Sequence, residues 1–309
     1  MRFLLNDTLK PGQRCFLSPT LGDYVSLTKP RVAALLLLTA LVPMFLAAEG
    51  PPSLARVGLT MVGGYLAAGG AGAVNCYLDR DIDGQMARTC HRALPSGRLE
   101  PRRALTLGIV LGLLAVLTLW FGTHPLAALL ALTAFLHYVF VYTLWLKRRS
   151  PHSVVIGGAA GAMPPLVGWA AMSGTLSPLA LVLFAIVFCW TPAHFWALAL
   201  MRRREYADAG IPMLPVVRGR PITRRRIVAY AALTVLLTAL PVVTGILGVA
   251  YAAAAALLGV WFLHSALRML HRSDTKTVRR FYFSTLFYLT ALFLGILVDR
   301  LLTTWFGLR

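Results

Sequence analysis

The chain has 309 residues, of which 58% are hydrophobic and only 13% are charged. This balance lies outside the range of soluble globular proteins and indicates a polytopic membrane protein, with the lipid bilayer as its surroundings. A net charge of +19 would suit a nucleic-acid-binding protein only if the basic residues gathered on one water-facing surface. Here they lie between apolar segments, which argues against nucleic acid as a partner.

Apolar windows of about 17 to 25 residues predict nine membrane-spanning helices. The predicted spans are 32–48, 57–78, 104–121, 126–146, 153–172, 179–201, 227–248, 250–267 and 281–303. No soluble domain or close internal repeat is evident, so we expect residues 1–309 to form one all-α membrane domain. Residues 1–31 lack the apolar core and cleavage site of a signal peptide, and we expect them to form a retained cytoplasmic N-terminal arm.

The basic residues predict how these helices are oriented. With the N-terminus in the cytoplasm, 27 of the 30 Lys and Arg residues fall on the cytoplasmic side, and only Arg56, Arg300 and Arg309 fall outside. The positive-inside rule therefore fits nine spans with the C-terminus outside. Because the outer connections are short and nearly uncharged, we expect any polar chemistry on the cytoplasmic side.

The cysteines predict neither a disulfide framework nor a zinc site. Cys15, Cys76, Cys90 and Cys189 are far apart in the sequence and form no Cys-x-x-Cys or Cys/His ligand spacing. We therefore expect ordinary thiols.

Three of the eleven acidic residues lie where the second span ends, in the sequence NCYLDRDID. On a continuing helix Asn75, Asp79 and Asp83 share one face, because they recur every four residues, whereas Asp81 points away. Carboxylates at membrane depth are costly unless they are paired or coordinated. Hard oxygen ligands in a partly enclosed pocket suit Mg²⁺, which commonly links carboxylates to substrate phosphates. We therefore predict a bound Mg²⁺ and a diphosphate substrate.

The loop that follows these acids, ARTCHRALPSGR, is basic. Arginine forks match phosphate oxygens bidentately, so Arg88 and Arg92 are candidates for binding the diphosphate. The alternative is that the acids and bases form internal ion pairs. That alternative is strongest for Asp81, which could pair with Arg80 or Arg88 at a helix end.

The end of the fourth span is a second candidate region. Its sequence VYTLWLKRRSPH contains Tyr142, Lys147 and Arg148, although a basic run at this position also fits simple positive-inside anchoring. Runs of small residues in the second and fifth spans, GGYLAAGGAG and GGAAGAMPPLVG, predict close packing of membrane helices. We expect this packing to bring the cytoplasmic ends of the second and sixth spans towards one pocket.

The sixth span and the loop after it hold the remaining candidates. His194 follows Pro192, where a kink would free backbone groups. The histidine is expected either to bind a freed carbonyl or to face a polar cavity as a ligand or proton-transfer group. Glu205 and Asp208 are three residues apart, so on a helix they would share a face as a second metal site. Arg202 to Arg204 could instead neutralise them.

Three stretches resemble the UbiA-type intramembrane prenyltransferases. They are NCYLDRDID with RALPSGR, YTLWLKRRSPHSVVIGGAAGAMPPLVGWAA, and WTPAHFWALAL with AGIPMLPVVRG. The last two resemble the heme O synthase branch of that family in particular. The resemblance implies nine helices around a central cavity in the inner membrane of a cell. It also implies Mg²⁺-dependent transfer of a farnesyl group from farnesyl diphosphate to the vinyl group of heme b, and a heme A synthase or oxidase-assembly partner.

The same resemblance implies roles for individual residues. By match of motif, the ligands of the metal-diphosphate are Asn75, Asp79 and Asp83. Arg88, Arg92, Lys147 and Arg148 would neutralise the diphosphate oxygens, and Glu205 would belong to a second acidic site. Tyr142, His194 and Asp208 are further candidates for substrate binding, from their positions in the sequence rather than from the resemblance. Cys76 stands where many members of the family have an additional aspartate, so the first site relies on two carboxylates and an amide.

Three other functions remain open at the level of sequence. The first is a prenyltransferase whose acceptor is a quinone or chlorophyll precursor. The second is an ion-coupled transporter. The positions of the acidic residues argue against it, because they lie at helix ends and form no carboxylate pair at the membrane midplane. The third is a purely structural partner of an oxidase complex, which would show no turnover.

Overall fold

The computed structural model describes residues 20–272 and 274–306. Every regular element in this part of the chain is helical, and nine helical segments within it are long and apolar enough to cross a membrane. The predicted all-α class and the predicted number of spans are therefore confirmed. Residues 1–19, which include Cys15 and most of the predicted N-terminal arm, lie outside the described residues. The three described cysteines are free thiols.

The helices follow one another along the chain with short connections, except for the longer loop between Gln85 and Pro101. The spanning helices are α2 (Pro30–Ala47), α3 (Leu54–Leu78), α5 (Pro101–Gly122), α6 (Pro125–Leu136) with η1 (His137–Leu146), α7 (Ser153–Ala162) with α8 (Pro164–Ser173), α9 (Pro178–Met201), α12 (Gly219–Val243), α13 (Val249–His271) and α14 (Thr275–Phe306). The short helices are α1 (Leu21–Leu27), α4 (Arg80–Gln85), α10 (Arg203–Asp208) and α11 (Leu214–Val217).

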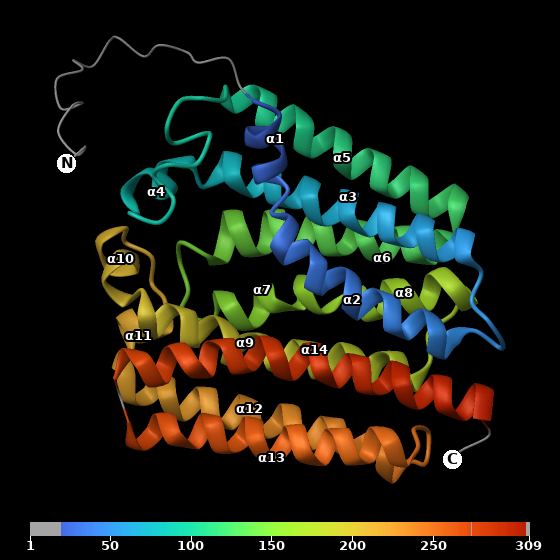
Figure 1. Ribbon diagram of the computed structural model, residues 1–309. Helices are drawn as coiled ribbons and strands as arrows, with labels where there is room; N and C mark the ends of the chain where they lie inside the picture. Colours follow the sequence, from blue (N-terminus) through green and yellow to red (C-terminus); the bar gives the residue numbers. More distant parts are fainter. Residues whose placement is uncertain (1–19, 273, 307–309) are drawn as a thin grey trace, which may run out of the picture.

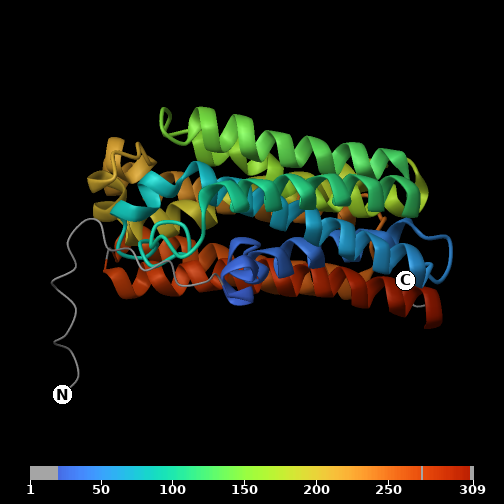
Figure 2. The same cartoon turned by 90° about the horizontal axis from the view of Figure 1, so that it is seen from above.

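The long helices lie side by side in one bundle (Figure 1). The short helices α4, α10 and α11 gather at one end of it, and Figure 2 shows the same arrangement from above. We call this end of the bundle the short-helix end. The acidic sequence after α3 and the loop after α9 therefore lie at the same end, as the alternation of spans predicts.

Two spanning helices begin more than one helical turn before the start that the apolar windows predicted. α12 begins at Gly219 and α14 at Thr275, before the predicted starts at 227 and 281. The added turns carry basic residues, which a hydropathy window excludes, whereas helical hydrogen bonding continues beyond the apolar zone and arginine is a good helix former.

The fourth and fifth spans are not regular α-helices. The fourth continues from α6 into the π-helix η1, and the amide of Lys147 just beyond it donates to the carbonyl of Tyr142 at 2.8 Å. The fifth divides into α7 and α8 around Met163, because Pro164 has no amide hydrogen to continue the ladder. The wide π turns change which side chains of η1 face α3, and such turns are frequent at functional sites.

Small residues let α3 approach its neighbours closely. A Cβ atom on Gly70 would lie 2.8 Å from the carbonyl oxygen of Gly108 in α5, and one on Gly72 would lie 2.9 Å from the carbonyl oxygen of Leu27. The run of small residues is therefore a packing surface, as predicted. It brings the segment before α2 against α3, and the end of α3 packs against η1. The expected approach of the second and sixth spans at this end is supported by Ile82 and Met86, which follow α3 and share a core cluster with Trp196 and Tyr206.

Candidate functional site

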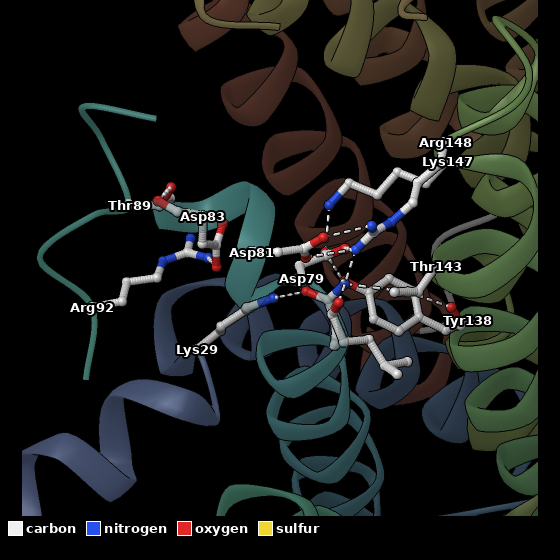
Figure 3. Close-up of polar contacts among 12 residues, drawn as sticks. Lys29, Asp79, Asp81, Asp83, Thr89, Arg92, Tyr138, Thr143, Lys147 and Arg148 are labelled. Carbon is white, nitrogen blue, oxygen red and sulfur yellow. Dashed lines mark hydrogen bonds and ion pairs between the residues drawn. The ribbon is translucent and has the colours of Figure 1, made fainter. Parts of the chain in front are cut away.

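Asp79 lies at the centre of a polar cluster at the short-helix end (Figure 3). It sits between α3 and α4, and only 1% of its surface is exposed. Its Oδ2 accepts a hydrogen bond from Asn75 Nδ2 at 2.6 Å and is paired with Lys147 Nζ. Its Oδ1 is buried and has no hydrogen-bond partner among the described residues, and Arg148 Nη2 lies 4.0 Å away. One carboxylate oxygen is thus held in place while the other remains available.

Asn75 links Asp79 to two further elements. Its Oδ1 accepts a hydrogen bond from Lys29 Nζ at 2.7 Å, and its Nδ2 also donates to Thr143 Oγ1 at 3.2 Å. A lysine ammonium can only donate, so the amide oxygen must face Lys29 and the amide nitrogen must face the two acceptors. The orientation of Asn75 is therefore fixed by its neighbours. We call Lys29, Asn75, Asp79, Thr143, Lys147 and Arg148 the Asp79 cluster.

Lys29 and Thr143 are members of this cluster that the sequence analysis missed. Lys29 precedes Pro30 at the start of α2 and has a left-handed backbone with φ of 51°. This backbone conformation is energetically unfavourable for every residue except glycine. The sequence did contain a signal for Lys29, because a lysine directly before the proline that begins an apolar span lies at a membrane helix end. Thr143 gave no signal, because its position depends on the π turns of η1.

Asp83 belongs to a second pair beside the Asp79 cluster. It is 5% exposed, and its Oδ2 accepts a hydrogen bond from Arg92 Nη1 at 2.7 Å. The helix is interrupted at Asp79, and Figure 3 shows Asp83 and Arg92 on one side of Asp79 with Lys147 and Arg148 on the other. Arg92 is therefore placed at the acidic site. The predicted Arg88 is exposed and has no polar contact with the described residues.

Asp81 forms an internal ion pair, which was the alternative for this residue. It is exposed and binds Arg148 through both carboxylate oxygens, each at 2.7 Å. The partner differs from the predicted Arg80 or Arg88, because Arg80 donates to the carbonyl of Tyr77 and lies over the Tyr77 ring. The hydrogen bonds from Arg148 hold the pKa of the Asp81 carboxyl below its usual value.

We expect Asp81→Asn to lower the free energy of unfolding by no more than about 1 kcal/mol, because exposed ion pairs are screened by water. The contribution is present above about pH 4, where an unfolded aspartate is ionised, and is lost as the pH falls through the lower folded pKa. Thermal unfolding of the solubilised wild type and variant at about pH 7 and about pH 3 checks this. An equally large difference between the two proteins at the lower pH would contradict it.

The predicted second acidic site is not assembled in the described part of the chain. Glu205 is partly exposed and pairs with Arg202 at 2.7 Å, and Asp208 is exposed. Within residues 20–272 and 274–306, no three His, Cys, Asp or Glu side chains lie close enough together to hold a metal ion, either in this loop or at Asp79 and Asp83. Glu205 is therefore neutralised by its own loop, as the alternative interpretation held.

Tyr142 and His194, the last two predicted residues, lie inside the bundle. Tyr142 stacks on Tyr138 with ring centroids 5.3 Å apart, and Gly157 leaves room for its ring, because a Cβ there would overlap it. His194 is 7% exposed, and its Nδ1 lies 2.7 Å from Thr285 Oγ1 of α14. It binds this hydroxyl rather than a carbonyl freed by Pro192.

The donor chemistry of the Asp79 cluster fits Mg²⁺. Asp79 Oδ1 is a buried carboxylate oxygen to which no other part of the described structure donates a hydrogen bond, and hard oxygen atoms are the ligands that Mg²⁺ prefers. Lys29, Lys147 and Arg148 surround the same carboxylate and amide. Several cationic groups so close to the ligands suit a metal that arrives together with an anion, rather than a bare divalent cation.

Comparison with known proteins gives the family. Residues 36–295 match the UbiA prenyltransferase family. The chain belongs to this family. As a member of it with nine apolar helices among its described residues, the protein is a multi-pass membrane protein.

Curated relatives of this UbiA family member carry one name. It is 54% identical over 280 residues to a protoheme IX farnesyltransferase of Roseiflexus sp. (strain RS-1), an alignment that covers 91% of this chain and 52% of that protein. It is 46% identical over 295 residues to the protoheme IX farnesyltransferase of Symbiobacterium thermophilum, covering 95% of this chain and 97% of that protein. The chain thus spans about half the length of the first relative and nearly all of the second.

Solved structures share the fold of this UbiA family member. A structure described as digeranylgeranylglyceryl phosphate synthase superposes with a TM-score of 0.76 at 17% identity, over 91% of this chain and 98% of that one. A UbiA homolog from Archaeoglobus fulgidus bound to DMAPP and Mg²⁺ has a TM-score of 0.63 at 17% identity, over 89% and 99% of the two chains. These likenesses establish the common helical architecture.

Proposed function

We propose that this protein transfers the farnesyl group of farnesyl diphosphate to the vinyl group of heme b, giving heme O and diphosphate. The observation that carries the proposal is the free, buried oxygen of Asp79 beside cationic side chains at one end of a membrane bundle. Heme b as the acceptor is supported by the relatives named protoheme IX farnesyltransferase. A prenyl diphosphate as the donor is supported by the Archaeoglobus fulgidus homolog bound to DMAPP and Mg²⁺.

In this proposal Asn75, Asp79 and Asp83 hold Mg²⁺, which when bound stabilises negative charge on the diphosphate. The other groups that contact the diphosphate come from three segments: Lys29 before α2, Arg92 after α4, and Lys147 with Arg148 after η1. In the free protein Lys147 and Arg92 are paired with Asp79 and Asp83. Those pairs keep the cations in place and the buried carboxylates neutralised until substrate arrives.

The chemistry proceeds by departure of the diphosphate. The allylic C–O bond breaks with its electron pair remaining on diphosphate, and the cationic side chains stabilise the charge that accumulates there. The vinyl double bond of heme b then attacks the farnesyl cation, and water adds to the resulting heme cation with loss of a proton. The bundle excludes bulk water from the first of these cations, because a wet site would hydrolyse it.

The proposal also assigns a setting. We place the protein in the inner membrane of the cell as one integral-membrane domain, with the short-helix end in the cytoplasm. The distribution of 27 of the 30 Lys and Arg residues supports this orientation. A heme A synthase or an oxidase-assembly factor would receive the product.

Reconstitution tests the activity directly. Purified protein in nanodiscs, incubated with heme b, farnesyl diphosphate and Mg²⁺, should yield a product with the mass of heme O. Chelation of Mg²⁺ with EDTA should lower the rate by about 100-fold or more, and excess Mg²⁺ should restore it. If a quinone precursor is prenylated and heme b is not, the assignment of heme b as the acceptor is overturned. An undiminished rate in EDTA would overturn the proposed metal site.

A further inference from the structure

The protonation of the His194 ring is fixed by its neighbour. Thr285 Oγ1 donates its hydrogen to the carbonyl of Tyr282 at 2.6 Å, so it has none left for the imidazole 2.7 Å away. The hydroxyl oxygen must therefore accept a hydrogen bond from Nδ1–H of His194. A charged imidazolium would be costly among these apolar surroundings, so the ring is neutral and its lone pair is on Nε2.

The Nε2 atom of His194 makes no polar contact with the described residues. It has no hydrogen-bond partner within the described residues, although His194 as a whole is only 7% exposed. The atom itself is not fully enclosed. The enclosed side-chain atoms that lack a partner belong to other residues, namely Asp79, Ser153, Trp196, Arg224 and Tyr288. The unprotonated nitrogen is thus accessible and unpaired among the described residues.

The ring is also held rigidly. It is stacked between Trp190 at 4.6 Å and Tyr282 at 4.7 Å, and the edge of Phe195 lies against it at 5.3 Å. The indole nitrogen of Trp190 donates to the carbonyl of Thr285 at 2.9 Å, which ties α9 to α14 at the same level. A neutral imidazole whose other nitrogen donates to a fixed acceptor is the arrangement that proteins use for metal-ligating histidines.

We propose that His194 Nε2 is an axial ligand of the heme b iron while the vinyl group is farnesylated. This inference rests on the proposed function, because it concerns how the acceptor is held. His194 lies about 10 Å along α9 from Met201, which ends the helix at the short-helix end. The ligand would hold the porphyrin near the short-helix end, where the proposed farnesyl diphosphate site lies, and would favour an iron porphyrin over a quinone acceptor.

Binding of two porphyrins tests the bond to iron. Wild type should bind heme b more tightly than metal-free protoporphyrin IX, and its ferrous complex should show an iron–histidine stretch in resonance Raman spectra. His194→Ala should bind heme b at least about 100-fold more weakly than wild type. The variant should also lose the iron–histidine band, and added imidazole should restore it. Its affinity for protoporphyrin IX should be unchanged, which a merely structural role of His194 would not predict.

Further variants separate the ligand from its support. Thr285→Val should weaken heme b binding by about 10- to 100-fold, and Thr285→Ser, which keeps the hydroxyl, should not. His264→Ala is the matched control, because His264 is an exposed histidine of α13, and it should keep the Raman band. An iron–histidine band that persists in His194→Ala would overturn the assignment of His194 as the heme ligand. If wild type still forms heme O, the proposed function would stand in that case. Failure of wild type to form heme O would overturn the function itself.

Discussion

Asp79→Asn should lower farnesyl transfer by about 10³-fold or more, while the protein still inserts into the membrane. The amide keeps the size of the side chain but removes the charge that attracts Mg²⁺, and it cannot neutralise Lys147, which is only 14% exposed in its side chain. The initial rate of heme O formation in nanodiscs at saturating Mg²⁺ measures the effect. The loss should not be recovered by adding more Mg²⁺, because the ligand itself is changed.

Glu100→Gln is the control for this variant. Glu100 lies in the loop after α4, is exposed, and among the described residues pairs only with Arg103, at 3.5 Å. The Glu100→Gln variant should therefore transfer the farnesyl group at the wild-type rate. Removal of Asp79 also leaves Lys147 without its carboxylate, so size-exclusion chromatography must show that the variant is folded. A folded Asp79→Asn protein that retains more than a tenth of wild-type activity would overturn the metal-diphosphate site.

Gly168→Ala should destabilise the bundle by about 3 kcal/mol or more. Gly168 lies in α8 where that helix packs on α2. A Cβ atom there would overlap the backbone carbonyl oxygen of Ala40, closer than real side chains approach. A backbone atom inside a helix cannot move aside as a side chain would, so the two helices must separate. Thermal unfolding in detergent should show a lower midpoint and the expression level should fall.

Gly161→Ala is the matched comparison, because it makes the same change seven positions earlier in the same span. A Cβ atom at Gly161 meets no atom within 4 Å, and alanine is the better helix former. Its thermal midpoint should equal or exceed that of wild type. Equal midpoints for Gly168→Ala and wild type would mean that α2 and α8 do not pack through this contact.

Local periodicity explains which parts of the site were predictable. Asn75 and Asp79 are four residues apart on one helix, so their alignment follows from helix geometry, and a 2.6 Å hydrogen bond joins them. Asp83 continues the same spacing, and its amide donates to the carbonyl of Asp79 at 2.8 Å across the interruption of the helix at Asp79. Its side chain pairs with Arg92, nine residues further along the chain, which helix geometry does not predict.

The partners from other helices were not predictable in the same way. Lys29 is 46 residues from Asn75 in sequence, and Lys147 is 68 residues from Asp79. Such pairs form only because small residues of α3 admit the segment before α2 and because η1 turns its side chains towards α3. Asp81 shows the same limit, since Arg80 or Arg88, both nearby in the sequence, was the expected partner, and Arg148 is the residue that binds it.

The sequence by itself determined the membrane class, the nine spans, the acidic residues at the end of α3 and the resemblance to the UbiA family. Each of these depends on apolar length, on spacing within one helix or on a short motif, which are properties of neighbouring residues in the chain. The tertiary structure alone decided that Asp79 keeps a free oxygen, that Asp81 is neutralised, and that His194 has a fixed protonation. Those outcomes depend on which side chains from distant segments reach one atom, and only the packing of the helices determines that.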